Sequence, residues 1–111
     1  MTAHQRNKGK RGELEAVRLL QAIYPDARRR VVNHAGVEDG VDLDGTGALR
    51  VQVKRQARYV PVTTLDEVRD DSGIPVVLTK CDRGEWRVIM RASDLLNILA
   101  DVGIAYEETT S

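Results

Sequence analysis

The sequence is poor in the residue types that define several protein classes. Cys81 is its only cysteine, so no disulfide can form within the chain and no cysteine cluster can bind a metal. It holds one tryptophan, three tyrosines and no phenylalanine, which argues against an aromatic platform for stacking bases. It contains no Walker-type or dinucleotide-binding glycine motif. Disulfide scaffolds and the common nucleotide-binding folds are therefore poor descriptions of this chain.

Long apolar stretches are also lacking. No apolar run approaches the ~18 residues of a membrane-spanning helix, and the first residues are polar and basic rather than of secretory type. We therefore expect a cytoplasmic protein with no membrane partner. The length of 111 residues suits a single domain. Within that domain, we expect a loose basic arm over 1–7 and a frayed tail over 104–111.

The net charge is zero, but the charges are unevenly distributed. Residues 1–58 hold 12 Lys and Arg against 7 Asp and Glu, a net charge of +5, whereas residues 59–111 hold 5 against 10, a net charge of −5. The basic half contains two clusters, one of Arg6, Lys8, Lys10 and Arg11, the other of Arg28, Arg29 and Arg30. Such clusters can neutralise phosphate groups, and they can equally form a solvated surface.

Hydrophobic periodicity predicts elements in the order α-β-β-β-α-β-β-α. Helices are expected at 9–24, 63–71 and 94–101, and strands at 27–33, 41–44, 48–55, 74–80 and 85–90. The second helix is expected to begin with a cap at Thr63 or Thr64, and the third with a cap at Ser93 and a stop at Gly103. This order predicts an α/β domain with a mixed central sheet flanked by helices.

On the first predicted helix, Glu13 lies on the apolar stripe. Spacings of four, three and four residues align it with Val17, Leu20 and Tyr24. An ionised carboxylate at the edge of a core is costly unless it is paired or bound to a metal. A carboxylate favoured by the helix dipole is the simpler interpretation, and a functional acid is the alternative.

The stretch "DLDGTGALRVQVKRQ", residues 42–56, predicts a β-hairpin. A three-residue loop over 45–47 pairs Asp44 with Ala48 and Asp42 with Arg50. One face of this hairpin then carries Asp42, Arg50, Gln52 and Lys54, and the other carries Val41, Leu43, Leu49, Val51 and Val53. The polar face is either an ordinary wet surface or the floor of a site.

Together with Glu13, these residues resemble the PD-(D/E)XK nuclease superfamily, and within it the small archaeal and phage Holliday junction resolvases. "KGKRGELEAVRLL" resembles the opening helix of that family, with Glu13 at the position of its glutamate. "GVDL" resembles its metal-aspartate motif and selects Asp42, and "VQVKR" occupies its Glu-x-Lys motif, with Lys54 as the lysine. With "GIPVVLTK" and "EWRVI" resembling later strands, the resemblance spans roughly residues 8–95.

The resemblance implies a restriction-endonuclease-like fold and a Mg²⁺-dependent endonuclease for branched DNA, most specifically for Holliday junctions, in which Mn²⁺ can substitute. It implies that Glu13, Asp42 and Gln52 hold the metal and that Lys54 assists the attacking water. Phosphate contacts are expected from Arg6, Lys8, Lys10, Arg11, Arg28, Arg29, Arg30 and Arg55. Symmetric cutting of a four-way junction needs two active sites, so the resemblance also implies a homodimer.

Gln52 departs from the family pattern, because this position usually holds a carboxylate ligand. An amide oxygen can coordinate a hard cation, but it contributes no negative charge. Three interpretations remain open: a junction resolvase with an amide ligand, a nuclease of the same fold that cuts flaps, single strands or one strand of a duplex, and a DNA-binding module that does not cut.

Overall fold

The computed structural model of this protein describes residues 3–30, 39–70 and 73–103. Its elements are α1 (Ala3–Leu20), β1 (Arg28–Arg29), β2 (Leu43–Asp44), β3 (Leu49–Gln56), the short 3₁₀ helix η1 (Val62–Glu67), β4 (Ile74–Cys81), β5 (Arg87–Ile89) and α2 (Ala92–Asp101). Their order and type agree with the α/β class expected from the sequence. Residues 31–33 of one predicted strand and the predicted tail over 104–111 lie outside the described residues.

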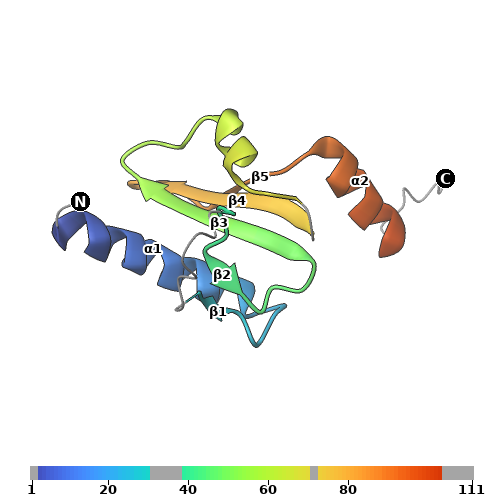
Figure 1. Cartoon of the computed structure of the whole chain (residues 1–111), viewed down its shortest axis with the longest axis horizontal. Helices are drawn as coiled ribbons and strands as arrows, with labels where there is room; N and C mark the ends of the chain where they lie inside the picture. Colours follow the sequence, from blue (N-terminus) through green and yellow to red (C-terminus); the bar gives the residue numbers. More distant parts are fainter. Residues whose placement is uncertain (1–2, 31–38, 71–72, 104–111) are drawn as a thin grey trace.

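A mixed three-stranded sheet, in the order β3-β4-β5, forms the centre of the molecule (Figure 1). β3 and β4 run parallel, with Leu49 opposite Ile74 and Gln56 opposite Cys81 at the two ends of the pairing. β5 pairs antiparallel with β4. The apolar run in β4 is buried almost throughout, which confirms the predicted central strand.

β2 and β3 do not pair as neighbouring strands, so the predicted β-hairpin is wrong. β2 instead pairs antiparallel with β1, which places Asp44 opposite Arg28. The link from this segment to β3 is a backbone hydrogen bond, in which the N–H of Asp42 donates to the carbonyl oxygen of Val51 at 2.8 Å. The predicted pairing of Asp42 with Arg50 is therefore shifted by one residue, and the two strands belong to different sheets.

The turn between β2 and β3 is closed by hydrogen bonds within the loop. The N–H of Leu49 donates to the carbonyl oxygen of Thr46 at 3.1 Å, and the Thr46 hydroxyl donates back to the Leu49 carbonyl oxygen at 2.9 Å. Gly45 and Gly47 both adopt positive φ angles, of 76° and 59°. This local bonding closes the turn within the loop rather than between two paired strands.

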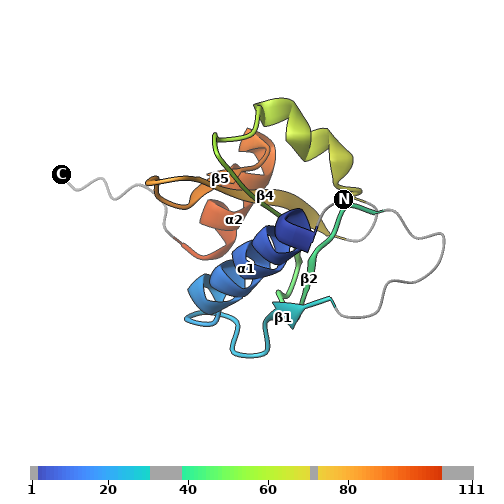
Figure 2. The same cartoon turned by 90° about the vertical axis from the view of Figure 1, so that its left-hand side faces the viewer.

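α1 covers one face of the sheet, as Figures 1 and 2 show. Its buried residues Ala16 and Val17 pack into a core with Ala27, Leu43, Val51, Val53, Val76 and Leu78. The helix begins at Ala3, so residues 3–7, which we expected in a loose arm, are helical. It ends at Leu20 rather than at residue 24, which leaves Ile23 outside the core with 74% of its surface exposed.

η1 lies on the opposite face of the sheet, over a smaller core of Val41, Val68 and Val77 (Figure 1). Val41 and Leu43 were expected on one face, but they pack in different cores. The chain is not a regular strand before Leu43, and Gly40 adopts a φ of 77° just before it. The segment consequently crosses the edge of β3 from one face to the other, with Asp42 at the crossing.

The two later helices differ from prediction at their starts. η1 begins after Pro61 without a side-chain cap, so neither threonine caps it and Thr64 is instead buried. α2 begins after Arg91, again without a side-chain cap, so the expected cap at Ser93 is wrong. Gly103 adopts a φ of 70° after the end of α2, as expected for a helix stop.

α2 extends away from the sheet, and none of its residues is buried (Figure 1). Leu95 and Leu96 are among the exposed large apolar side chains. Within the part of the chain that the structure describes, no helix has the length and apolar character needed to cross a membrane.

Candidate functional site

Asp42 lies against the outer edge of β3, the edge that does not face β4. Its Oδ2 atom accepts a hydrogen bond from the backbone N–H of Val53 at 2.8 Å, and its own N–H bonds to Val51. Alternate residues of a strand direct their backbone groups to the same edge, so these two valines are the ones that face Asp42. The side chain thus takes the place of a backbone acceptor from a neighbouring strand.

The environment of Asp42 opposes its ionisation. Burial raises the pKa of Asp42 from 3.8 to about 6, and the negative charge of Glu13 acts in the same direction. The hydrogen bond from Val53 and the positive charges of Lys54 and Arg30 act against that rise without cancelling it. Asp42 therefore lies within electrostatic reach of both Glu13 and Lys54, and a carboxylate perturbed in this way is characteristic of functional sites.

Gln52 and Lys54 project from the face of β3 that η1 covers, opposite to Val51 and Val53 in the larger core. Gln52 is 6% exposed, and its Nε2 donates to Oε1 of Glu67 at 3.3 Å. The Lys54 Nζ lies 3.8 Å from that same oxygen. Glu67, at the end of η1, is therefore the carboxylate that both Gln52 and Lys54 approach.

The Oε1 atom of Gln52 is buried and accepts no hydrogen bond from the residues that the structure describes. The opposite orientation of its amide would place this acceptor against the Glu67 carboxylate, which is also an acceptor, so the orientation with Nε2 toward Glu67 is the favourable one. A buried acceptor without a partner costs about 1–3 kcal/mol. A cation beside Oε1 would relieve this cost.

Glu13 approaches from the other face of the sheet. It lies on α1 and forms an ion pair with Arg29 at 2.8 Å, which satisfies a carboxylate that is only partly exposed. Because the segment before β2 crosses the sheet edge, Asp42 lies between Glu13 on one side and Lys54 on the other. Of the predicted residues, Asp42 thus interacts with both Glu13 and Lys54, whereas Gln52 is connected to Lys54 through Glu67.

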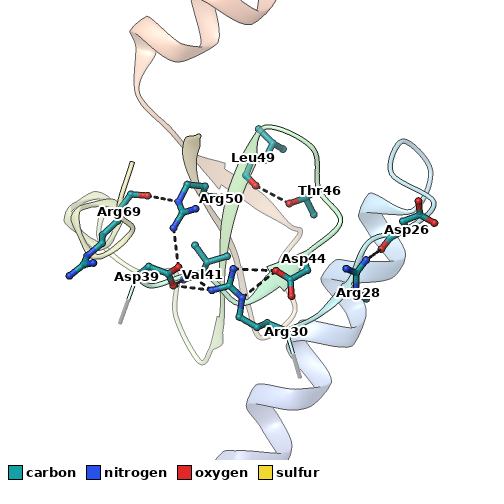
Figure 3. Close-up of polar contacts among 10 residues, drawn as sticks. All are labelled: Asp26, Arg28, Arg30, Asp39, Val41, Asp44, Thr46, Leu49, Arg50 and Arg69. Carbon is teal, nitrogen blue, oxygen red and sulfur yellow. Dashed lines mark hydrogen bonds and ion pairs between the residues drawn. The ribbon is translucent and has the colours of Figure 1, made fainter. Parts of the chain in front are cut away.

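An ion-pair network holds the segment that carries Asp42 (Figure 3). Arg30 donates to both carboxylate oxygens of Asp39 at 3.1 Å and to Oδ1 of Asp44 at 3.2 Å. Arg50 on β3 donates to Oδ2 of Asp39 at 3.0 Å. The network therefore ties both ends of the segment to Arg30, the residue that follows β1, and one end to β3 as well.

Asp39 and Arg30 are both stabilised in their ionised forms within this network. Burial opposes the ionisation of Asp39, but the hydrogen bonds from the N–H of Val41 and from Arg30 outweigh it and lower the pKa of Asp39. Burial likewise opposes the charge of Arg30, but its bonds to Asp39 and Asp44 raise the pKa of Arg30. Arg30, predicted to contact phosphate, is therefore committed to carboxylates of its own chain.

Two more of the predicted phosphate-binding residues are paired within the chain. Arg29 pairs with Glu13, and Arg55 pairs with Glu15 at 2.9 Å and lies 3.8 Å from Asp82. The sequence did not reveal these pairs, because the partners lie on different elements. Their positive charge is offset locally and is less available to DNA than the sequence suggested.

The other residues predicted to bind phosphate are exposed wherever the structure describes their side chains. Lys10 and Arg11 are exposed on α1 and form no ion pair with another described residue. Arg28 is also exposed and donates to the backbone carbonyl oxygen of Asp26 at 3.0 Å (Figure 3). The side chains of Arg6 and Lys8 lie outside the described part of the structure.

The donors around the β3 edge are carboxylate and amide oxygens, which are the ligands of hard cations such as Mg²⁺. Among the residues that the structure describes, no group of three or more His, Cys, Asp and Glu side chains is arranged to hold a metal ion. A cation site here would therefore depend on the amide of Gln52. Its unpartnered buried oxygen fits that role.

Glu67 is the residue of this cluster that the sequence did not predict. It lies 15 positions from Gln52 and on a different element, so no local spacing links the two. The only available signal was its acidic character in a short helix between two core strands.

Comparisons of this chain with protein-family models, with curated proteins and with solved structures found no match. The resemblance to PD-(D/E)XK nucleases therefore stays a prediction from the motifs, and so does the restriction-endonuclease-like fold. The structure shows an α/β domain with a mixed three-stranded sheet flanked by helices.

Proposed function

We propose that this protein is a Mg²⁺-dependent endonuclease for branched DNA, most specifically a Holliday junction resolvase with a restriction-endonuclease-like fold. The observation that supports it is a desolvated carboxylate at one sheet edge, Asp42, within electrostatic reach of Lys54, while Lys54 and the buried amide of Gln52 both approach Glu67. The order of the sequence motifs supports it independently.

In this proposal Asp42, Gln52 and Glu13 hold the metal, with Mn²⁺ able to substitute. The bound ion would polarise the scissile phosphate and supply a hydroxide nucleophile near neutral pH. Lys54 positions the attacking water and stabilises the negative charge that develops on the phosphate. Because Gln52 is neutral, we expect weaker cation binding than a site with a carboxylate at this position would have.

The proposal extends to the partners and location of the protein. Outward-facing Lys10, Arg11 and Arg28 contact DNA phosphates, together with the paired arginines when the DNA displaces their carboxylate partners. Cutting two strands of a symmetric junction requires two sites, so the active form is a homodimer, which analytical ultracentrifugation can test. Location in the cytoplasm, with access to DNA, belongs to the same proposal.

The test is a cleavage assay on synthetic four-way junction, flap, duplex and single-stranded DNA, with and without Mg²⁺ at one fixed salt concentration. We expect paired, symmetric nicks in the junction only, and only with the metal. Cleavage confined to flaps or single strands would favour a nuclease of the same fold with another substrate. An absence of cleavage on all four substrates with Mg²⁺ and with Mn²⁺ would contradict a nuclease.

A second candidate is a DNA-binding module that does not cut. The amide at Gln52 and the zero net charge of the chain favour it. Gln52→Glu separates the two functions: if the natural protein is inert with Mg²⁺ and Mn²⁺ while this variant cuts, the natural protein is a binder. If the natural protein already cuts, the amide is a working ligand.

A further inference from the structure

The stability of η1 does not explain why its last residue, Glu67, is acidic. It is the last residue of η1, where an acidic side chain is disfavoured by the direction of the helix dipole. Its side chain is 57% exposed and packs in neither core. Local stability therefore gives no reason for a carboxylate at this position.

The contacts of Glu67 are weak as structural bonds. Its distance of 3.8 Å from Lys54 Nζ is too long for a hydrogen bond, and ion pairs between exposed groups contribute little to stability. The hydrogen bond from Gln52 is 3.3 Å, at the long end of the usual range. The carboxylate can therefore move by rotation of its side chain without the loss of a strong interaction.

Charge balance around the β3 edge also points to Glu67. The two carboxylates of Asp42 and Glu13 are offset by the two cations Arg29 and Lys54, while Arg30, which also acts on Asp42, is balanced by Asp39 and Asp44. With a neutral amide at Gln52, the first four of these groups together carry no excess negative charge for a divalent cation. Glu67 adds one negative charge, within hydrogen-bonding distance of the amide whose oxygen is buried and unpartnered.

We propose that Glu67 is an acidic ligand of the cation and supplies, from η1, the negative charge that Gln52 does not supply from β3. This rests on the proposed function, because it concerns the same cation. In the structure, Glu67 contacts Lys54 and the Nε2 atom of Gln52. With a cation beside Oε1 of Gln52, Glu67 would be a ligand of that cation instead of the partner of Lys54, and Lys54 would be left to interact with the phosphate.

Mn²⁺ binding to the full chain without DNA tests this directly, by isothermal titration calorimetry and by the electron paramagnetic resonance signal of free Mn²⁺. Glu67→Gln is expected to weaken Mn²⁺ binding by at least about tenfold. Removal of a side chain that only supports a metal ligand already weakens binding by about that factor, so removal of a ligand should weaken it at least as much. Asp66→Asn is the matched control, because it removes the same charge from the neighbouring exposed residue of η1. It is expected to leave binding unchanged within about twofold.

Two double variants separate a ligand from a remote charge. Gln52→Glu with Glu67→Gln moves the carboxylate back to β3 and is expected to restore Mn²⁺ binding. Lys54→Met with Glu67→Gln removes both partners of the ion pair and is expected to remain weak, because no ligand is restored. Thermal unfolding of each variant verifies that it folds, which the exposure of Glu67 leads us to expect.

Three results would overturn the inference. Unchanged Mn²⁺ binding by Glu67→Gln would remove Glu67 from the site but leave the proposed function intact. Binding restored in the variant lacking both Lys54 and Glu67 would make Glu67 a counter-ion of the lysine. An absence of Mn²⁺ binding by the unaltered protein at millimolar concentrations would refute both the ligand and the metal-dependent function.

Discussion

The Oδ2 atom of Asp42 accepts the backbone N–H of Val53 at 2.8 Å, so a side-chain carboxylate occupies a place on the edge of β3 that a strand would otherwise fill. Exposed strand edges carry unpaired donors that favour association with other chains. One residue thus satisfies the sheet edge and carries a carboxylate of the proposed site whose pKa is raised by burial. Stability and activity are therefore expected to have opposite requirements at this position.

Asp42→Asn is expected to stabilise the protein above pH 6. The pKa of Asp42 is about 6 in the folded protein, against 3.8 for an ordinary aspartate. Ionisation of Asp42 therefore lowers the free energy of unfolding. This loss of stability is absent below pH 3.8 and complete above about pH 6. Asparagine keeps an acceptor for Val53 and removes this cost, which is up to about 3 kcal/mol. Urea unfolding between pH 4 and 8 without metal measures it, and a variant less stable than the unaltered protein at pH 8 would contradict it.

Asp39→Asn is expected to lower the unfolding free energy by about 2 kcal/mol at pH 7, between the values for exposed and buried ion pairs. Asp39 is largely buried, with 14% of its side chain exposed, and it pairs with both Arg30 and Arg50. Because the pKa of Asp39 is lowered in the folded protein, this stabilisation is present above pH 3.8 and is lost as the pH falls below it. The difference between variant and unaltered protein should thus vanish in acid, whereas a constant difference would indicate a packing effect.

Gly45→Ala is expected to destabilise the protein by more than about 1 kcal/mol. Gly45 has a φ of 76°, and a Cβ atom there would collide with the backbone carbonyl oxygen of Asp26. Gly9→Ala is the contrasting variant, since a Cβ at Gly9 meets nothing within 4 Å and the residue lies inside α1. It should stabilise the protein by roughly 0.5–1 kcal/mol. Thermal unfolding of both variants checks the opposite signs, and equal effects would contradict this account of the turn.

Lys54→Ala is expected to reduce junction cleavage by at least about 100-fold, because the charge on the phosphate and the attacking water lose their stabilising group. Lys80→Ala is the control: Lys80 lies on the neighbouring strand, is similarly exposed and pairs with Glu15 instead. Single-turnover cleavage rates at saturating Mg²⁺ distinguish the two variants. Undiminished cleavage by the Lys54 variant would refute the assignment of the site.

Lys10→Gln and Arg11→Gln are each expected to reduce the salt dependence of junction binding by about one unit of log affinity per log salt. Both residues are exposed on α1 without an ion pair to another described residue. Arg18→Gln, an exposed arginine further along the same helix and outside the predicted contacts, is the matched control. Binding titrations at several salt concentrations give the slopes, and equal slopes for all variants would remove the N-terminal cluster from the DNA interface.

Local sequence signals were sufficient to predict several of the elements. The apolar run of β4, the alternation along β3 and the glycine stop after α2 each depend on neighbouring residues, so their periodicity sufficed to predict them. The choice of Asp42 and Lys54 as site residues came instead from the resemblance to nuclease motifs, and it stays a prediction.

The contacts between residues of different elements, by contrast, became known only from the three-dimensional structure. It paired β2 with β1, separated Val41 from Leu43 at the crossing of the sheet edge, and brought Glu67 to Gln52. Strand partners and ion pairs depend on contacts between distant positions, which local periodicity does not encode. For the same reason, three arginines that the sequence predicted to bind phosphate form ion pairs with carboxylates of the same chain: Arg29, Arg30 and Arg55.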